Sequence, residues 1–290
     1  MIRSMTGFGS ASGRVGSSRV VVELRSVNHR FLNPNVKLPP SLAKWEGEVR
    51  EVLRGGLARG HVAVSARIEH DVAGGSLVNE AAFGEAVQQL RSLQERFALD
   101  GALDVATVLR MPSVVGDGDP DLAAGSAEEL SAIVRDALHA LVAMRLAEGA
   151  RLTDLMRERL TVVEQALERI AARAPERLTS ERERLRASVR DLAGGIDVDE
   201  ARLAQEIAVL ADRLDVSEEI DRFRAHVAAF REALTGEKGP VGKRLGFLLQ
   251  EMLHEAYTTG SKARDSVMLH DVVAVKEELE RIAEQVENVE

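Results

Sequence analysis

The 290-residue chain contains no cysteine, and only 3% of its residues are aromatic, with one Trp and one Tyr. The absence of cysteine excludes disulfides, thiolate metal sites and a cysteine nucleophile, and it is typical of proteins in a reducing compartment. The scarcity of aromatic residues argues against a base-stacking surface of the RNA-recognition-motif type.

Long apolar runs are also missing. No uninterrupted apolar segment approaches the ~18–20 residues that a membrane helix needs. The N-terminal MIRSMTGFGS lacks the apolar core of a signal peptide. The composition, 45% hydrophobic and 29% charged, is that of an ordinary globular protein. We therefore expect a soluble cytoplasmic protein with no membrane partner.

The net charge of −9 is unevenly distributed along the chain. Residues 1–70 carry 11 Lys and Arg against 5 Asp and Glu, whereas residues 71–290 carry 27 against 42. A basic N-terminal part is compatible with phosphate binding, and an acidic remainder with carboxylate chemistry. Charge alone favours the simpler interpretation that the opposite charges assist packing or assembly.

Hydrophobic periodicity predicts an α+β fold. Alternation over 19–25 and 61–68 predicts strands, with a short extended piece at 36–38. Helical spacing predicts helices over 42–53 and 80–98, and nearly everything after residue 127 is helical except near Pro175, Gly194 and 236–242. We expect three parts: a mixed α/β domain at 1–125, a long helical arm or hairpin at 126–198, and an all-α domain at 199–290.

The stretch LRSVNHRFL at 24–32 interrupts the strand pattern with polar and basic residues. Continued alternation would put Ser26, Asn28 and Arg30 on the buried face of the strand. We therefore expect a bulge or strand end there, with the basic groups turned outward. A rough strand end and a polyanion-binding surface explain the stretch equally well.

Two acidic blocks in the C-terminal third contain candidate chemistry. Ser217 is a plausible N-cap of a helix in which Glu219, Arg222 and His226 share one face. On the next helix Glu251 and Glu255 are spaced i, i+4, where two carboxylates repel unless a cation lies between them. The alternatives are a surface salt bridge and a solvated helix face. The Gly-rich loop 236–244 lacks P-loop spacing and is best explained as a turn.

Five motifs together resemble those of the bacterial YicC family: MIRSMTGFG at 1–9, ELRSVNHRFL at 23–32, LARGHVAVS at 57–65, QEIAVLADRLDVSEEIDRFRAH at 205–226 and RLGFLLQEMLHEAYTTGSK at 244–262. They occur in the family's order along the whole chain. The resemblance implies an endoribonuclease that cleaves RNA phosphodiester bonds with a divalent metal, in RNA turnover, regulation or the stress response. It also implies a ring-like homo-oligomer, with a hexamer favoured, and possible contact with other RNA-decay proteins.

The resemblance singles out residues of this chain, and we infer their roles from their chemistry. The predicted catalytic residues are Glu219, His226, Glu251 and Glu255. The predicted ligands of Mn²⁺ or Mg²⁺ are Glu206, Glu219, Glu251 and Glu255, which would place the ion near the scissile phosphate. The predicted RNA-binding residues are Arg25, Asn28, His29, Arg30, Lys243, Arg244 and Lys262.

Three departures from the family pattern fall on one stripe of the 242–262 helix. Gly246, Leu253 and Tyr257 stand where the family usually has polar residues, while Glu251 and Glu255 on another arc are retained. Two alternatives to an enzyme follow. The chain is a non-catalytic oligomeric RNA-binding adaptor or regulator, or it is an assembly scaffold whose carboxylates form salt bridges between subunits.

Overall fold

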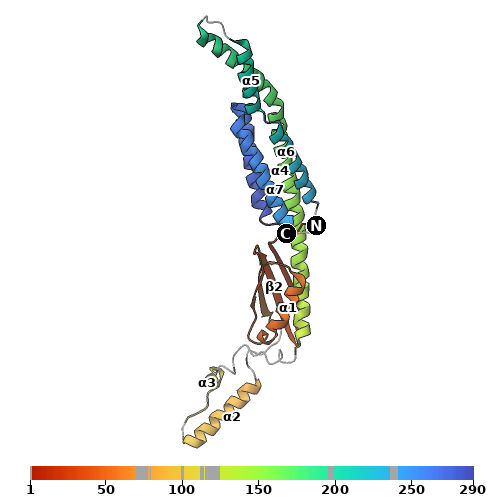
Figure 1. Ribbon diagram of the computed structural model, residues 1–290. Helices are drawn as coiled ribbons and strands as arrows, with labels where there is room; N and C mark the ends of the chain where they lie inside the picture. The colour runs from red at the N-terminus through yellow and green to blue at the C-terminus, as the bar shows by residue number, and fades with distance from the viewer. Residues whose placement is uncertain are drawn as a thin grey trace. The chain divides into compact units, whose positions relative to one another are not determined.

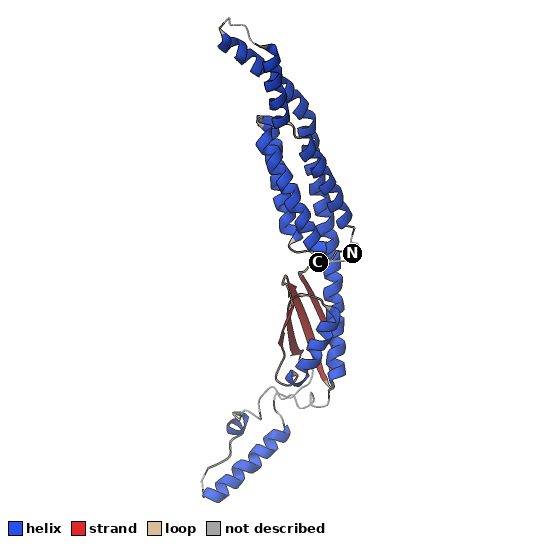
Figure 2. Ribbon diagram, viewed as in Figure 1, coloured by secondary structure: helices blue, strands red, loops and turns tan. Residues whose placement is uncertain are grey.

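The computed structural model describes residues 2–69, 78, 80–98, 101–111, 114, 125–194, 199–235 and 241–290. It confirms the α+β fold class, with one sheet and otherwise helices (Figure 2). The described residues form two compact units, Phe8–Leu141 and Met1–Gly7 with Val142–Glu290, which we call the sheet unit and the helical unit. The boundary falls inside α4 (Ala127–Ala193). The three-part division at 125 and 198 stays a prediction.

The sheet unit contains β1 (Gly7–Val15), β2 (Ser18–Val27), β3 (Leu32–Lys37) and β4 (Gly60–Glu69), in the order β1-β2-β4-β3 (Figure 1). β2 runs antiparallel to β4, and β3 runs parallel to it. The predicted alternation is confirmed, since Val20, Val22 and Leu24 are fully buried. A 3₁₀ turn (Ala43–Trp45) and α1 (Glu46–Gly56) follow β3 and contribute Val49 and Leu53 to the core.

The first turns of α4 cover the buried face of the sheet. A Cβ atom added at Gly9 on β1 would lie 2.2 Å from the Ala137 backbone oxygen and 2.4 Å from the Leu141 backbone nitrogen of α4. Only glycine permits so close an approach of helix and strand backbones. This contact explains why the end of the sheet unit lies within α4. The unit also contains α2 (Glu80–Phe97), as predicted, and the short α3 (Val105–Leu109).

The helical unit packs the later part of α4 against α5 (Glu200–Leu214), α6 (Ser217–Ala233), α7 (Val241–Ala263) and α8 (Ser266–Val286). Each of α4, α6, α7 and α8 contributes an apolar stripe at helical spacing to one core. None of the described helices combines the length and apolar character that a membrane span requires.

The expected helix break near Pro175 is wrong, because α4 continues through this residue. An interior proline removes one backbone hydrogen bond and costs about 3 kcal/mol. Contacts on both sides hold the helix in place here. Ala171 and Ala174 pack against the core, and the buried Arg177 donates hydrogen bonds to the Ala263 and Leu214 carbonyl oxygens, both at 2.6 Å.

Both ends of the described chain belong to the helical unit and lie side by side (Figure 1). Met5 donates a backbone hydrogen bond to Asn288 at 2.8 Å. The side chain of Arg145 is 2% exposed, and its Nε donates to the Ser4 carbonyl oxygen at 2.5 Å while its guanidinium pairs with Glu290. This buried arginine therefore fastens the two terminal segments to α4.

Candidate active site and nucleic-acid surface

The predicted strand end in LRSVNHRFL is confirmed. β2 ends at Val27, Ser26 is buried, and the side chains of Arg25, Asn28, His29 and Arg30 are exposed. His29 Nδ1 lies 2.8 Å from the Phe31 carbonyl oxygen, which orients the imidazole along the turn into β3. The four predicted RNA-binding residues of this segment therefore lie together on the surface of the sheet unit.

The two C-terminal motifs come together on one antiparallel helix pair. Lys262 Nζ of α7 lies 2.8 Å from Glu219 Oε1 of α6, and Arg222 Nη1 lies 3.9 Å from Glu255 Oε1. These two contacts fix the register of the pair, because a step forward along α6 is a step backward along α7. The same register places His226 level with residues 251–255.

Glu219 is a buried carboxylate that is already paired. Glu219 is 6% exposed, and its partner is Lys262. Lys262 Nζ also donates to the Asp215 carbonyl oxygen at 2.9 Å. Glu219 Oε2 is buried and accepts no hydrogen bond from any described group. A buried carboxylate of this kind depends strongly on its single cation, because an uncompensated buried charge is costly.

Glu255 is buried as well, with 3% exposure, and its cation is the exposed Arg222, which also pairs with Glu218. His226 and Glu251 differ from the two buried carboxylates. Both side chains are half-buried, and neither forms a hydrogen bond or ion pair with another described residue. They are the predicted catalytic groups that remain available to a ligand.

The start of α6 differs in detail from the prediction. Val216 and not Ser217 occupies the N-cap position, and Ser217 is the first helical residue. The Asp215 carboxylate takes over the capping role by accepting from the Ser217 hydroxyl at 2.6 Å and from its backbone N–H at 2.9 Å. These hydrogen bonds lower the pKa of Asp215 below its ordinary value, since they stabilise the charged form.

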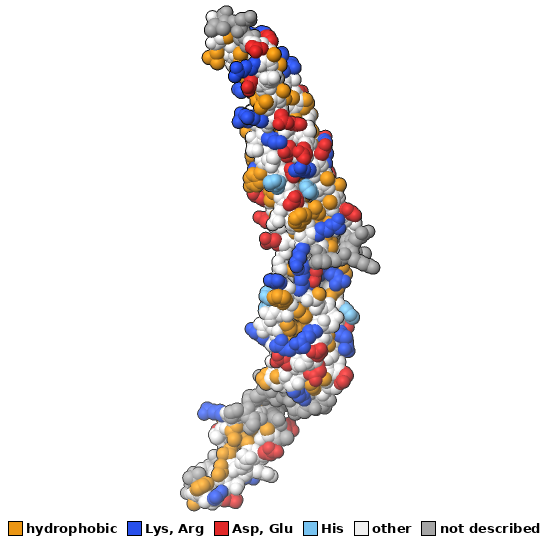
Figure 3. All heavy atoms as spheres, in the orientation of Figure 1, with side chains coloured by type: hydrophobic (Ala, Val, Ile, Leu, Met, Phe, Trp, Pro, Cys, Tyr) orange, Lys and Arg blue, Asp and Glu red, His pale blue; other side chains and the backbone are white. Residues whose placement is uncertain are grey.

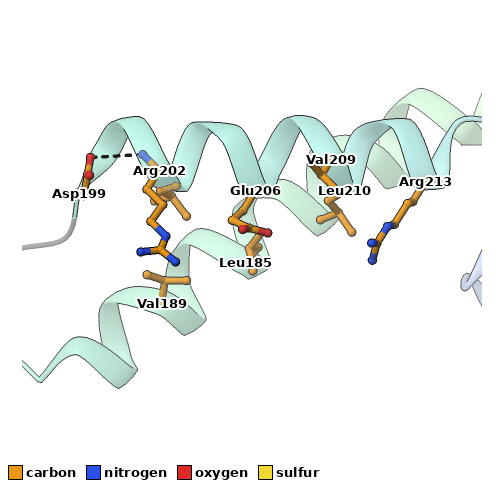
Figure 4. A pocket seen from close by; sticks show the side chains of 9 residues that line it. Leu185, Val189, Asp199, Arg202, Glu206, Val209, Leu210 and Arg213 are labelled. Atoms are coloured by element: carbon orange, nitrogen blue, oxygen red, sulfur yellow. Dashed lines mark hydrogen bonds between the residues drawn. The ribbon is translucent and has the colours of Figure 1, made fainter.

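Glu206 lies elsewhere in the helical unit. It lines a groove of about 400 Å³ between the end of α4 and α5, together with Leu185, Val189 and Arg202 (Figure 4). Its carboxylate is exposed, and none of the other three predicted metal ligands is among the described residues that line this groove.

The remaining predicted RNA-binding residues are at the two ends of α7. Lys243 and Arg244 are exposed in its first turn, where Arg244 Nη2 lies 3.7 Å from Glu232 Oε2. Lys262 is in its last turn, and its ammonium is engaged by Glu219. Most of the Gly-rich loop, residues 236–240, lies outside the described residues.

The described carboxylates do not fit a resident divalent ion. Across the parts of the chain that the structure describes, no three His, Asp or Glu side chains lie close enough to hold a metal. A divalent ion at Glu219 would compete with Lys262 for the carboxylate, and one at Glu255 would compete with Arg222. The metal stays a prediction.

The three departures from the family pattern lie away from His226 and Glu251. Leu253 packs against the core of the helical unit, and Tyr257 lies beneath Lys276 of α8, with Nζ 3.6 Å from the ring centroid. A Cβ atom added at Gly246 would meet nothing within 4 Å. Sequence reasoning missed this Lys–Tyr contact because nothing local links residues 257 and 276.

The fold and this geometry define a mixed α+β protein with a basic strand end in its sheet unit and paired carboxylate and basic side chains in its helical unit. The chain belongs to the YicC-like endoribonuclease family. The family's N-terminal region, "Endoribonuclease YicC-like, N-terminal region", matches residues 2–154, and "Endoribonuclease YicC-like, C-terminal" matches residues 170–290.

Two relatives match along the full length of both chains. The "Probable endoribonuclease YicC" of Haemophilus influenzae is 34% identical over 292 residues. The protein of the same name from Clostridioides difficile is 31% identical over 299 residues.

Proposed function

We propose that the protein is an endoribonuclease that cleaves RNA on the α6–α7 helix pair, with His226 and Glu251 as its acid–base groups. The observation that carries the proposal is the difference among the four predicted catalytic residues. Glu219 and Glu255 are buried and paired with Lys262 and Arg222, whereas His226 and Glu251 are half-buried without a partner among the described residues. The family and the names of its relatives support RNA as the substrate.

The proposed reaction uses the ribose 2′-hydroxyl as the nucleophile. One group removes its proton, the oxygen attacks the adjacent phosphorus, and the bond from phosphorus to the 5′-oxygen breaks. The other group protonates the leaving 5′-oxygen, which leaves a 2′,3′-cyclic phosphate and a 5′-hydroxyl. An imidazole and a carboxylate suit these two transfers at neutral pH. The exposed Arg222 is placed to stabilise negative charge on the phosphate.

Glu219 and Glu255 act as positioning residues in this proposal. The Glu219–Lys262 pair holds the start of α6 against the end of α7, and Glu255 orients Arg222. The surface of the sheet unit around Arg25 and Arg30 supplies phosphate contacts, whose strength falls with salt. Assembly into a homo-oligomer is a further part of the proposal, as the family resemblance implies.

The test is cleavage of a 5′-labelled RNA by the purified full-length protein. Glu251→Gln is expected to slow cleavage by about 10²-fold or more while RNA binding is retained. Glu280→Gln on the exposed face of α8 is the matched control and should cleave at the wild-type rate. A parallel reaction with EDTA tests the predicted dependence on Mn²⁺ or Mg²⁺.

The alternative is a non-catalytic RNA-binding adaptor, and the departures at Gly246, Leu253 and Tyr257 motivate it. The contacts of Leu253 with the core and of Tyr257 with Lys276 favour the enzyme, because they leave the α6 side of α7 unaltered. Wild-type protein that binds RNA and leaves it intact, with or without divalent metal, would establish the adaptor instead.

A further inference from the structure

Among the described residues, one face of the sheet carries mostly exposed side chains on β1 and at the end of β2. Gly9 and Gly13 of β1 face α4, so the strand alternation turns Phe8 and its even-numbered neighbours to the opposite face. On β2 the same face carries Arg25 and Val27, and Val27 is paired with His61 of β4. In Figure 3, Lys and Arg side chains are visible over the sheet unit, with Asp, Glu and hydrophobic side chains among them.

Exposed aromatic rings and guanidinium groups alternate at the end of this face, where β2 leads into β3. Phe31 is 65% exposed and Phe8 is 38% exposed, so both rings are accessible to a ligand. The Arg30 guanidinium carbon lies 5.2 Å from the Phe31 ring centroid, and that of Arg25 lies 5.6 Å from the Phe8 ring centroid. These distances are those of cation–π contacts.

Two imidazoles extend the same surface. The ring centroids of His29 and His61 are 6.5 Å apart. We call the whole set the aromatic–basic patch: Phe8, Arg25, His29, Arg30, Phe31 and His61. The acidic residue Glu23 lies 4.0 Å from Arg25, but its carboxylate is closer to Arg67, at 2.8 Å, so the charge of Arg25 is only partly offset.

We propose that the aromatic–basic patch binds single-stranded RNA by stacking unpaired bases on Phe8 and Phe31 while Arg25 and Arg30 contact the flanking phosphates. This rests on the proposed function for the choice of RNA, and it deepens that function by naming the substrate class. Every unpaired base has a π face, so such stacking is tolerant of sequence. Paired bases are hidden in a duplex, so the patch discriminates against double-stranded RNA.

The low aromatic content of the chain argued against a base-stacking surface. The overall fraction of aromatic residues does not determine whether a stacking surface exists, because two rings placed beside two guanidinium groups are sufficient for one. Phe8 and Phe31 are 23 positions apart in sequence. Phe8 lies on β1 and Phe31 directly precedes β3, so the two rings belong to opposite edge strands but to the same end of the sheet, where β2 ends and β4 begins. Positive charge next to these rings favours RNA over an apolar protein partner.

The experiment compares binding of three labelled RNAs by fluorescence anisotropy: a 20-nucleotide single strand, an abasic strand with the same number of phosphates, and a duplex. The full-length double variant Phe8→Leu/Phe31→Leu is expected to bind the single strand at least about tenfold more weakly than the wild type. The wild type is expected to bind the duplex and the abasic strand weakly, and the double variant should bind both with the same affinity as the wild type. Phe97→Leu, which alters a phenylalanine 60% exposed at the end of α2, is the matched control and should bind all three as the wild type does.

Two outcomes overturn the proposal. The first is wild-type affinity of the double variant for the single strand. The second is a change of molecular mass in light scattering that accompanies any loss of affinity, which would make the patch an interface between copies of this chain. A different result would contradict the proposed function alone. Wild-type protein that binds the single strand without cleaving it would show that the protein is not an endoribonuclease, while RNA binding by the aromatic–basic patch would still be supported.

Discussion

Replacing Lys262 by Met removes the cation that pairs with the buried carboxylate of Glu219. The wild-type ammonium donates to Glu219 Oε1 at 2.8 Å and to the Asp215 carbonyl oxygen at 2.9 Å, and the variant loses both contacts. Glu219 would then be a buried carboxylate without a hydrogen bond from any described residue, because its Oε2 has none in the wild type.

The magnitude follows from the burial of the two partners. Breaking a buried ion pair by removing one partner costs about 3–5 kcal/mol. Because the Lys262 side chain is 31% exposed, water can reach this site, and we expect the lower end of the range, about 3 kcal/mol. For a protein of this size such a loss lowers the melting temperature by about 6–12 °C.

Urea unfolding followed by circular dichroism measures this loss. Lys243→Met on the exposed first turn of α7 is the matched control, with an expected change within about 0.5 kcal/mol. The double variant Lys262→Met/Glu219→Gln should be more stable than Lys262→Met alone, because it no longer buries a charge. A loss below about 1 kcal/mol for Lys262→Met, or additive losses in the double variant, would refute the reasoning.

Two further predictions concern Asp265 and Gly9. The pKa of Asp265 is lowered from its ordinary value of 3.8, chiefly by the Met268 backbone N–H, so the unfolded chain takes up the proton first as pH falls. The stability that ionised Asp265 contributes is therefore present above pH ~4–5 and is lost as pH falls through the folded pKa. The difference in urea midpoint between the wild type and Asp265→Asn should accordingly become smaller in acid. Gly9→Val would drive Cβ into the Ala137 backbone oxygen 2.2 Å away, and thermal unfolding should show a loss of more than about 3 kcal/mol. At Gly47 in α1 an added Cβ meets nothing within 4 Å, so Gly47→Ala should be at least as stable as the wild type.

Local patterns in the sequence predicted most of the fold. The alternation of Val20, Val22 and Leu24 identified β2 and its buried face, and helical spacing identified α2 and the helices after residue 127. The end of β2 was predictable because no buried strand accommodates Asn28 and Arg30. Pro175 misled the prediction, since the contacts of Arg177 with distant carbonyl groups hold α4 together there and cannot be seen in the local sequence.

The candidate site was predictable only in part. Sequence spacing put Glu219 and His226 on one helix and Glu251 and Glu255 on another, and the family motifs singled them out. Which carboxylates are buried, and which cation each one contacts, depends on the register of α6 against α7. Helical periodicity does not determine that register, so the partnership of Glu219 with Lys262 across 43 positions had no signal of its own.

The decisive measurement is the rate of RNA cleavage by His226→Ala under single-turnover conditions with RNA fully bound. We expect a loss of about 10²–10⁴-fold relative to wild type. His270→Ala, which alters an exposed histidine on α8, should retain the wild-type rate. Equal rates for His226→Ala and the wild type, at equal occupancy by RNA, would contradict the assignment of catalysis to the α6–α7 pair.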